Sequence, residues 1–562
     1  MKIKHLLTSE GKALTGNEYD LYPRPQLKRE SFFSLNGEWD FQVGEDKMKI
    51  LVPYPPESLL SGVGKTFSQK DVLIYSRNFA LPQGFLKDRV ILNVGAIDQR
   101  CSIFINAQHV SSFISGYLAN SIDITDYLNE DENKIEIRVT DNLSKHIIPY
   151  GKQKHKRGGM WYTPVSGIWQ SVWFESVPFN HIKSLKITPV NDTVEILAYG
   201  VEGATLTLDL GKKSLDFPME KVFNQICGVK IKIDEPTFWS PECPYLYNFR
   251  VKSDSDLVES YFALRTIDVQ EIDGVKRLCL NGKPYFFHGL LDQGYFSDGI
   301  YTPASPDLYR QDIQKMKDLG FNTLRKHIKI EPEWFYYECD RIGMVVFQDM
   351  VNNGKYSFIY DTALPTIGLK NLPEKKRSKK ERDAFISFMK GTVTQLYNHP
   401  CVCYWTIFNE GWGQFSSDEM YDLLVSLDKT RIIDTNSGWF GKHKSDVESL
   451  HVYFKPVKAV KSDKPIVLSE FGGYSYKVKG HVANEKDTYG YKLFEDREKF
   501  EDALISLYEN EIVPFVKEGL CGAILTQLSD VEDETNGILT YDRAVCKVDR
   551  DKMIELASKL KI

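Results

Sequence analysis

The sequence has no long hydrophobic run. It contains no stretch of about 18 consecutive apolar residues, the length that a membrane-spanning helix requires. Its first 16 residues also lack the apolar segment and small-residue cleavage site of a secretory signal. We therefore expect no membrane partner and a cytoplasmic location.

An excess of positive charge is also absent. Lysine and arginine total 71 against 77 aspartate and glutamate residues, which gives a formal net charge of −6. Proteins that bind nucleic acid need a positive field to neutralise phosphates. The composition therefore predicts no nucleic-acid partner.

Cysteine is sparse and poorly placed for metal binding. The 9 cysteines are scattered, and Cys401 and Cys403 form a lone Cys-x-Cys with no matching second pair. This spacing does not suit zinc, no HExxH cluster occurs, and we expect all nine thiols to be reduced. We predict no catalytic metal and no cofactor, although a structural ion near the site stays open.

Two further groups of enzymes lack their usual motifs here. No GxGxxG or GxxxxGK[ST] loop follows a predicted strand, which disfavours an NAD- or nucleotide-dependent α/β enzyme. No Gly-x-Ser-x-Gly elbow is present, which disfavours a serine hydrolase triad.

Short β-strands dominate the first half of the chain. Residues 1–178 contain alternating or β-branched runs such as 89–94 and 134–139, separated by turn residues and not interrupted by helical periodicity. This pattern predicts a jelly-roll sandwich. Residues 179–267 continue with short strands in a smaller unit, for which we predict an immunoglobulin-like sandwich.

From residue 268 to 562 strands and helices alternate. We predict strands at 285–289, 322–327, 344–349, 401–409, 432–436, 449–453, 466–470 and 521–527. Helical patterns lie between them at 307–319, 381–397, 418–427 and 500–516. Ser305 before Pro306 suggests an N-cap hydroxyl with proline at the first helical position. Eight strands interleaved with helices favour a (β/α)8 barrel over a doubly wound sheet.

Two predicted barrel strands end in glutamate. Residues 405–410 read WTIFNE and residues 465–470 read PIVLSE, so Glu410 follows the fourth strand and Glu470 ends the seventh. Active sites of such barrels lie at the carboxyl ends of the strands. Two carboxylates on opposite sides of the barrel would face each other, as retaining glycoside hydrolysis requires at about 5–5.5 Å. Arg325, at the end of the second strand, would favour ionised Glu470.

The order of these motifs resembles glycoside hydrolase family two, the β-galactosidase, β-glucuronidase and β-mannosidase superfamily. Short motifs along almost the whole chain carry the resemblance: YPRP at 22–25, LNGEW at 35–39, VGAID at 94–98, GIWQ at 167–170, NGKP at 281–284 and the two glutamate-bearing strands. The resemblance implies hydrolysis of a terminal β-linked sugar through a covalent glycosyl-enzyme. It implies Glu410 as the general acid/base and Glu470 as the nucleophile.

The resemblance also assigns binding residues. Asn409 matches the residue that hydrogen-bonds the sugar 2-hydroxyl, and Tyr453 matches a tyrosine that contacts the nucleophile. Arg325 and His327 resemble the family's Arg-x-x-His pair, although the spacing is one residue shorter. Carboxylates and indoles at strand ends suit sugar hydroxyls and apolar sugar faces, so further contacts are predicted for Asp292, Asp349, Trp412, Trp439 and Asp530.

The sugar itself is not determined. No Asn-x-Lys element of the kind that β-glucuronidases use for a carboxylate is found, so a neutral, β-galactosidase-like sugar is favoured, with β-glucuronidase or β-mannosidase activity as the alternative. A non-catalytic carbohydrate-binding protein on the same scaffold is a second hypothesis. We expect a small oligosaccharide or glycoside as substrate, and a homo-oligomer as the default assembly.

Overall fold

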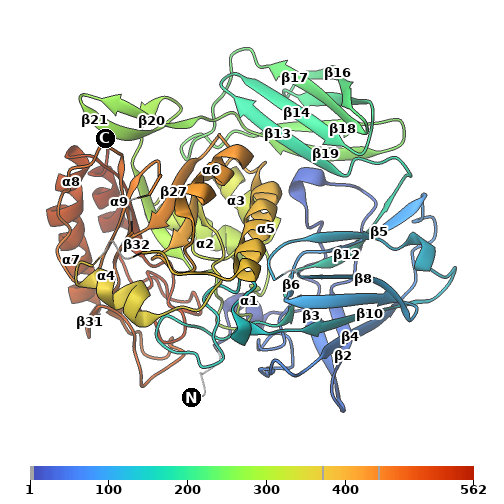
Figure 1. Cartoon of the computed structure of the whole chain (residues 1–562), viewed down its shortest axis with the longest axis horizontal. Coiled ribbons are helices and arrows are strands. Elements are labelled where there is room, and N and C mark those ends of the chain that lie inside the picture. Colours follow the sequence, from blue (N-terminus) through green and yellow to red (C-terminus); the bar gives the residue numbers. More distant parts are fainter. Residues whose placement is uncertain (1–5, 115, 370–372, 441–442) are drawn as a thin grey trace.

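The computed structural model describes residues 6–114, 116–369, 373–440 and 443–562. Two β-sandwiches, blue and green in Figure 1, lie on one side of a C-terminal barrel that runs from yellow to red. This is the predicted architecture: a jelly-roll-like sandwich, an immunoglobulin-like sandwich and a (β/α)8 barrel. Among the described residues, no helix combines the length and the apolarity needed to cross a membrane.

The first sandwich packs two antiparallel sheets around one hydrophobic core. A four-stranded sheet has the order β1-β12-β5-β9, and a six-stranded sheet has the order β3-β2-β4-β10-β7-β8. Alternation explains the packing, because Ile135, Ile137 and Val139 of β10 are buried while the residues between them are more exposed. The strands are β1 (Phe33–Ser34), β2 (Gly37–Val43), β3 (Asp46–Val52), β4 (Leu73–Phe79), β5 (Arg89–Val94), β6 (Ile97–Asp98), β7 (Arg100–Ile105), β8 (Gln108–Ile114), β9 (Asn120–Asp123), β10 (Asn133–Thr140), β11 (Gly167–Ile168) and β12 (Val172–Val177).

The second sandwich is built from seven antiparallel strands in the order β13-β14-β17-β16-β15-β18-β19. The long strand β16 is shared, because its first half pairs with β15 and its last residues pair with β17. Apolar residues from both halves enclose one core. The strands are β13 (Ser184–Val190), β14 (Thr193–Tyr199), β15 (Ala204–Asp209), β16 (Ser214–Phe223), β17 (Ile226–Lys232), β18 (Tyr247–Lys252) and β19 (Leu257–Phe262).

A small antiparallel sheet precedes the barrel and is formed by β20 (Ile267–Ile272), β21 (Val275–Leu280) and β22 (Lys283–Pro284). The barrel sheet has eight parallel strands in the order β27-β26-β25-β24-β23-β32-β29-β28. All eight predicted strands are present: β23 (Phe287–Asp292), β24 (Thr323–Lys326), β25 (Val345–Asp349), β26 (Val402–Asn409), β27 (Ile432–Ser437), β28 (Glu448–Val452), β29 (Ile466–Gly472) and β32 (Leu520–Thr526).

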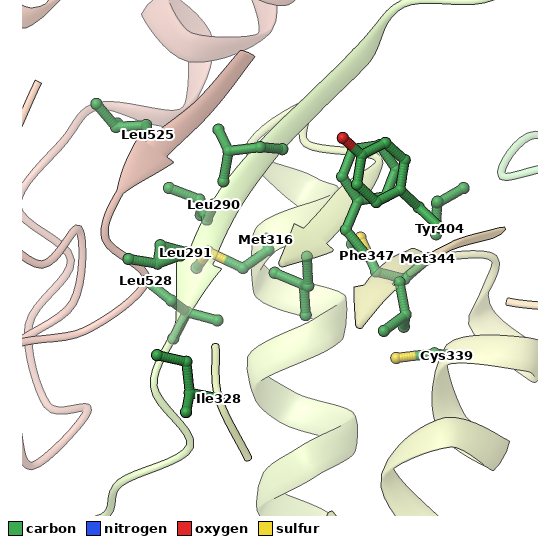
Figure 2. Packing of buried hydrophobic residues seen from close by; sticks show 14 of the residues in the cluster. Leu290, Leu291, Met316, Ile328, Cys339, Met344, Phe347, Tyr404, Leu525 and Leu528 are labelled. Carbon is green, nitrogen blue, oxygen red and sulfur yellow. The ribbon is translucent and has the colours of Figure 1, made fainter. Parts of the chain in front are cut away.

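Side chains close the ring between the two edge strands β27 and β28. The Nε2 atom of His451 in β28 lies 2.8 Å from the Oγ atom of Ser437 in β27. Apolar residues fill the barrel and join it to its helices. Figure 2 shows Met316 of the covering helix near Leu290 and Leu291 of β23. Between two neighbouring barrel strands, the rings of Phe347 and Tyr404 are stacked with centroids 4.1 Å apart. The centre is therefore a filled core, and only its mouth is available for chemistry.

Helices cover the barrel strands. They are α2 (Asp307–Asp318), α3 (Glu333–Ile342), α4 (Leu364–Thr366), α5 (Lys379–Leu396), α6 (Ser417–Leu427), α7 (Arg497–Leu507), α8 (Val513–Lys517) and α9 (Arg550–Ser558), with a π-helical turn at Tyr508–Ile512 between α7 and α8. A four-residue helix, α1 (Ser9–Lys12), precedes the first sandwich. Two short strands, β30 (Tyr474–Tyr476) and β31 (Lys492–Phe494), pair outside the barrel.

The predicted helical range from residue 307 is confirmed for α2, but its predicted N-cap is wrong by one residue. Pro306 is the residue before the helix, and no side chain caps this end. Ser305 instead accepts a hydrogen bond from the Leu308 amide through its backbone oxygen, at 3.1 Å. The proline has no N–H to donate, so it is tolerated at the cap position as it is at the first helical position.

Candidate active site

Polar side chains gather at the carboxyl ends of five barrel strands. Arg325 lies in β24, Asp349 ends β25, Asn409 ends β26, His451 lies in β28 and Glu470 lies in β29. Parallel strands in a barrel place their carboxyl ends at one rim. Residues that are 145 positions apart, Arg325 and Glu470, are therefore direct neighbours.

Glu410 follows β26 in an unusual backbone conformation. Its φ is +54°, in the left-handed region that side chains other than glycine rarely adopt. The backbone is held there because the Glu410 amide donates to the Ser437 carbonyl at 3.0 Å and the Trp412 amide donates to the Asn409 carbonyl at 2.9 Å. Left-handed residues of this kind cluster at functional sites, where surrounding contacts maintain them. The Glu410 side chain stays 12% exposed.

Glu470 is directed into the mouth by an irregularity in β29. The pairing of β29 shifts register between Leu468 and Phe471 on its β32 side. Such a bulge re-aims a side chain. The Glu470 carboxylate accepts hydrogen bonds from Arg325 Nη1 at 3.0 Å and from the Tyr453 hydroxyl at 2.5 Å.

His451 lies between the two glutamates. Its Nδ1 atom is 2.9 Å from Glu410 Oε1 and 3.5 Å from Glu470 Oε2. One oxygen of each carboxylate and a ring nitrogen of His451 all lie within 4.8 Å of one another. Within the described ranges, Glu410, His451 and Glu470 are also close enough together to bind a metal ion. An ion bound there would occupy both carboxylates.

The charge of Glu470 is controlled by its neighbours. Burial alone would raise the pKa of this carboxyl, since a charged group loses hydration. The charges of His451, Arg325 and His327 and the hydrogen bond from Tyr453 act in the opposite direction and lower its pKa to about 2. Glu470 is therefore ionised at neutral pH.

Arg325 connects several parts of the site. Its Nε atom donates to Asp349 at 3.0 Å, and its Nη2 atom donates to the side-chain oxygen of Asn409 at 2.8 Å. Asp349 also lies 2.9 Å from His327 Nδ1. Because the oxygen of Asn409 is taken by Arg325, its amide nitrogen is the group left to donate. Asp349 therefore orients Arg325 and His327 rather than pointing at either glutamate.

The two predicted tryptophans have different surroundings. Trp439 donates its Nε1–H to the Glu410 backbone oxygen at 3.3 Å, and its ring centroid lies 5.5 Å from that of His451. Trp412 instead donates to the Gly354 carbonyl at 2.9 Å and packs edge-on against Trp161. Trp439 therefore borders the site, whereas Trp412 belongs to an aromatic cluster beside it.

The structure places two predicted aspartates in ion pairs with buried lysines. Asp292 accepts from Lys326 Nζ at 2.5 Å, and Asp530 accepts from Lys547 Nζ at 2.6 Å. Both carboxylates also accept a backbone amide, from Gly294 and Gly537 respectively. Asp292 thus uses both carboxylate oxygens within the protein. Both contacts of Asp530 go to its Oδ1 atom, and its buried Oδ2 atom has no hydrogen-bond partner among the described residues. A substrate contact for either aspartate stays a prediction.

Sequence reasoning missed His451, the residue nearest to both glutamates. Side chains two positions apart on a strand point to the same face. His451 precedes the predicted Tyr453 by two residues at the end of a strand, so this spacing was the available signal. Ser437, which holds the other ring nitrogen of His451, gave no comparable signal.

The fold combines a barrel with two accessory sandwiches, and the family comparisons match the same three parts. The model described as Glycosyl hydrolases family 2, TIM barrel domain, matches residues 271–553. The galactose-binding domain-like model of the same family matches residues 65–164, and a third family 2 model matches residues 181–265. The chain belongs to glycosyl hydrolase family 2.

Individual relatives are distant. The chain is 26% identical over 428 residues to a putative β-glucuronidase of Formosa agariphila, covering 68% of this chain and 48% of that protein. It is 23% identical over 480 residues to a β-galactosidase of Thermoanaerobacter pseudethanolicus, covering 80% and 60%. The chain thus matches about half to three fifths of the length of these relatives.

Solved structures share the whole fold. A β-D-glucuronidase of Dictyoglomus thermophilum aligns with a TM-score of 0.73 and 18% identity, covering 96% of this chain and 98% of that one. A family 2 β-galacturonidase of Eisenbergiella tayi aligns with a TM-score of 0.68 and 18% identity, covering 96% and 99%. At this identity the likeness establishes the three-part fold.

Proposed function

We propose that the chain is a retaining exo-β-glycosidase with Glu410 as general acid/base and Glu470 as nucleophile. The observation that carries the proposal is the approach of the two carboxylates to within 4.8 Å. This separation suits double displacement, in which the carboxyl groups lie about 5–5.5 Å apart, and leaves no room for the water that an inverting mechanism needs.

The two roles follow from the surroundings of each glutamate. Glu470 is held ionised by Arg325 and Tyr453, as a nucleophile must be. Glu410 remains as the group that protonates the glycosidic oxygen. Attack of Glu470 on the anomeric carbon breaks the bond to the aglycone and forms a glycosyl-enzyme. Glu410 then takes a proton from water, which attacks the same carbon and releases the sugar with its β configuration.

The neighbouring side chains bind the sugar in this proposal. The free amide nitrogen of Asn409 is the donor for the 2-hydroxyl, beside the Glu410 that follows it. Trp439, next to His451, offers its indole to an apolar sugar face. Arg325, His327 and Tyr453 act mainly through Glu470, because each of them contacts that carboxylate or is held beside it by Asp349.

The sugar has two main candidates. The sequence favours a β-galactoside, because no Asn-x-Lys element of the kind that β-glucuronidases use for a carboxylate is recognised in it. The relatives and solved structures named above carry the names β-galactosidase, β-glucuronidase and β-galacturonidase. A neutral hexoside and a β-uronide are therefore both candidates, and β-mannosidase activity is the remaining one.

Chemical rescue tests both roles at once. A panel of nitrophenyl β-glycosides first identifies the best substrate. Glu470→Ala should abolish turnover, and Glu410→Ala should lower kcat by about 10²–10⁴-fold. Azide should restore activity in both. In Glu470→Ala it replaces the nucleophile and gives the α-glycosyl azide, whereas in Glu410→Ala it attacks the glycosyl-enzyme and gives the β-glycosyl azide.

Glu338→Ala serves as the control, because this glutamate lies on α3 and pairs with Arg341. It should keep wild-type turnover. Sugar binding without turnover of any panel member would support the carbohydrate-binding alternative. Identical azide products from both variants would contradict the assignment of roles.

A further inference from the structure

A segment of the first sandwich reaches the mouth of the barrel. It lies between β10 and β11, and its Tyr150 amide donates to the carbonyl of Asn352, just beyond β25, at 3.1 Å. The Thr163 amide donates to Glu532 Oε1 at 2.8 Å, and Arg157 lies 3.1 Å from Asp533 Oδ1. The segment is thus fastened to the loops that follow the third and eighth barrel strands.

The centre of this segment presses against the loop after β24. Gly151 has a φ of +67°, and a Cβ atom added to it would lie 3.0 Å from the backbone oxygen of Ile328, the residue after His327. Only glycine allows this approach without strain. Lys152 is the next residue, and its backbone therefore lies directly beside the part of the rim that carries Arg325 and His327.

Lys152 is fixed in place on both sides. Its backbone oxygen accepts from the Tyr162 amide at 3.0 Å, and the side chain of the next residue, Gln153, donates to Asp98 at 2.9 Å and to the Tyr117 hydroxyl at 3.0 Å. Lys152 itself is only 8% exposed. The backbone of Lys152 is thus held at the mouth by a folded segment.

The other buried lysines of the barrel mouth have anionic partners. Lys326 pairs with Asp292 and Glu331, Lys329 pairs with Glu331, and Lys547 pairs with Asp530, all at 2.9 Å or less. Within the described part of the chain, no carboxylate oxygen lies within 4.0 Å of Lys152 Nζ. With its side chain mostly buried and no carboxylate close by, Lys152 is placed to pair with an anion from outside.

The charge of Lys152 acts on residues beside the nucleophile. Burial lowers the pKa of His327, and the positive charge of Lys152 lowers it further. His327 Nδ1 lies 4.0 Å from Glu470 Oε1. Burial raises the pKa of Glu534 to about 7 although Lys152 opposes this, so Glu534 is only partly ionised at neutral pH. Glu534 is therefore an incomplete counter-ion for the lysine.

We infer that Lys152 binds a carboxylate on the sugar in the active site, which makes a β-uronide the substrate. The inference rests on the proposed function and departs from the neutral sugar favoured by the sequence. In this inference Lys152, a cation from another domain, takes the place of the Asn-x-Lys element that β-glucuronidases use. Hydrogen bonds between two charged groups are roughly twice as strong as those between neutral groups, so a carboxylate at Lys152 should add clearly to binding.

The test compares sugars that differ at carbon 6. Nitrophenyl β-D-glucuronide and β-D-galacturonide are compared with the matching glucoside, galactoside and 6-phosphogalactoside. The wild-type protein should favour one of the uronides. Lys152→Met should lower kcat/KM for that uronide by about 10–100-fold while changing the neutral glycosides less than about threefold. Lys152→Arg should retain part of the preference.

Lys154→Met is the matched control, because Lys154 is an exposed lysine of the same segment that lies over the Trp161 ring. It should leave the preference unchanged. Calorimetric binding of free glucuronate and galacturonate to Glu470→Ala gives a second reading that needs no turnover, and Lys152→Met should weaken it by a similar factor.

Different results would contradict the role of Lys152 and the proposed glycosidase function. A best substrate that is neutral or phosphorylated, or an equal loss on all sugars in Lys152→Met, would overturn the role of Lys152 and leave the glycosidase proposal intact. No turnover of any β-glycoside would instead count against the proposed function.

Discussion

At the scale of single residues, the account depends on how one carboxylate is kept ionised. Arg325, His451 and Tyr453 surround Glu470 and outweigh the effect of its burial. Asp349 contributes indirectly, since it holds both Arg325 and His327. The ionised state of Glu470 is thus set by the side chains that surround it and by Asp349, which holds two of them in place.

Removing one hydrogen bond should move the pH profile. Tyr453→Phe deletes the hydroxyl that donates to Glu470 Oε2 at 2.5 Å. This bond favours the charged carboxylate, so its loss should raise the pKa of Glu470 from about 2. Since the nucleophile must be ionised, the acid limb of kcat/KM should shift to higher pH, and kcat should fall by about 10–100-fold.

Tyr491→Phe is the control for this variant. The Tyr491 ring stacks on Tyr453 with centroids 4.0 Å apart, and the substitution keeps that stack. We expect its acid limb to match the wild type. A Tyr453→Phe profile without any shift would show that this hydroxyl does not control Glu470.

The residues of the site were partly predictable. Glu410, Asn409, Glu470 and Arg325 stand at the ends of strands, where polar residues after an apolar run stand out. His451 was missed because its role depends on which face of β28 meets the barrel axis. Lys152 gave no local signal, since it reaches the site from a different domain.

At the scale of elements, the segment between β10 and β11 links the first sandwich to the barrel. Trp161 in this segment packs edge-on against Trp412, with centroids 5.2 Å apart, and against Tyr356 at 5.1 Å. Trp412 lies two residues after Glu410. The aromatic cluster therefore connects the docking of this segment to the loop that carries the proposed acid/base.

Removing an aromatic ring from this cluster should lower the stability of the protein and weaken substrate binding at the barrel mouth. Trp161→Ala should lower the free energy of unfolding by about 3–5 kcal/mol, as large-to-small changes of buried aromatics do. Denaturant unfolding measures the loss, and KM for the best substrate should rise in the same variant because Lys152 and the Glu410 loop lose support. Trp161→Phe should retain most of both properties. An Ala variant as stable as the wild type would contradict the packing role.

Helices and strands were predictable where burial leaves a clear pattern of apolar residues in the sequence. Seven of the eight barrel strands are buried along their whole length, and several of them, such as β26 and β29, appear as apolar runs. The eighth, β28, is mostly half-buried. The helix α3 was missed because its residues Trp334, Phe335, Tyr336 and Tyr337 are weak helix formers. Strand β16 was missed because Pro218 interrupts it, which normally argues against a strand interior.

At the scale of the whole molecule, the proposed active site draws on more than one domain. In this proposal the barrel supplies both glutamates, and the segment between β10 and β11 of the first sandwich supplies Lys152. The architecture was predictable from the order of patterns along the chain: two stretches of short strands followed by alternating strands and helices. The contact between sandwich and barrel was not predictable, because it joins segments such as Arg157 and Asp533 that are far apart in sequence.

The stereochemistry of the first product tests the central claim most directly. The best nitrophenyl β-glycoside of the panel is hydrolysed by the wild-type protein in deuterated buffer, and the anomeric protons are followed by NMR from the first minutes. Two displacements at carbon 1 predict that the β anomer appears first and the α anomer only later, by mutarotation. Initial release of the α anomer would contradict double displacement by Glu470 and Glu410.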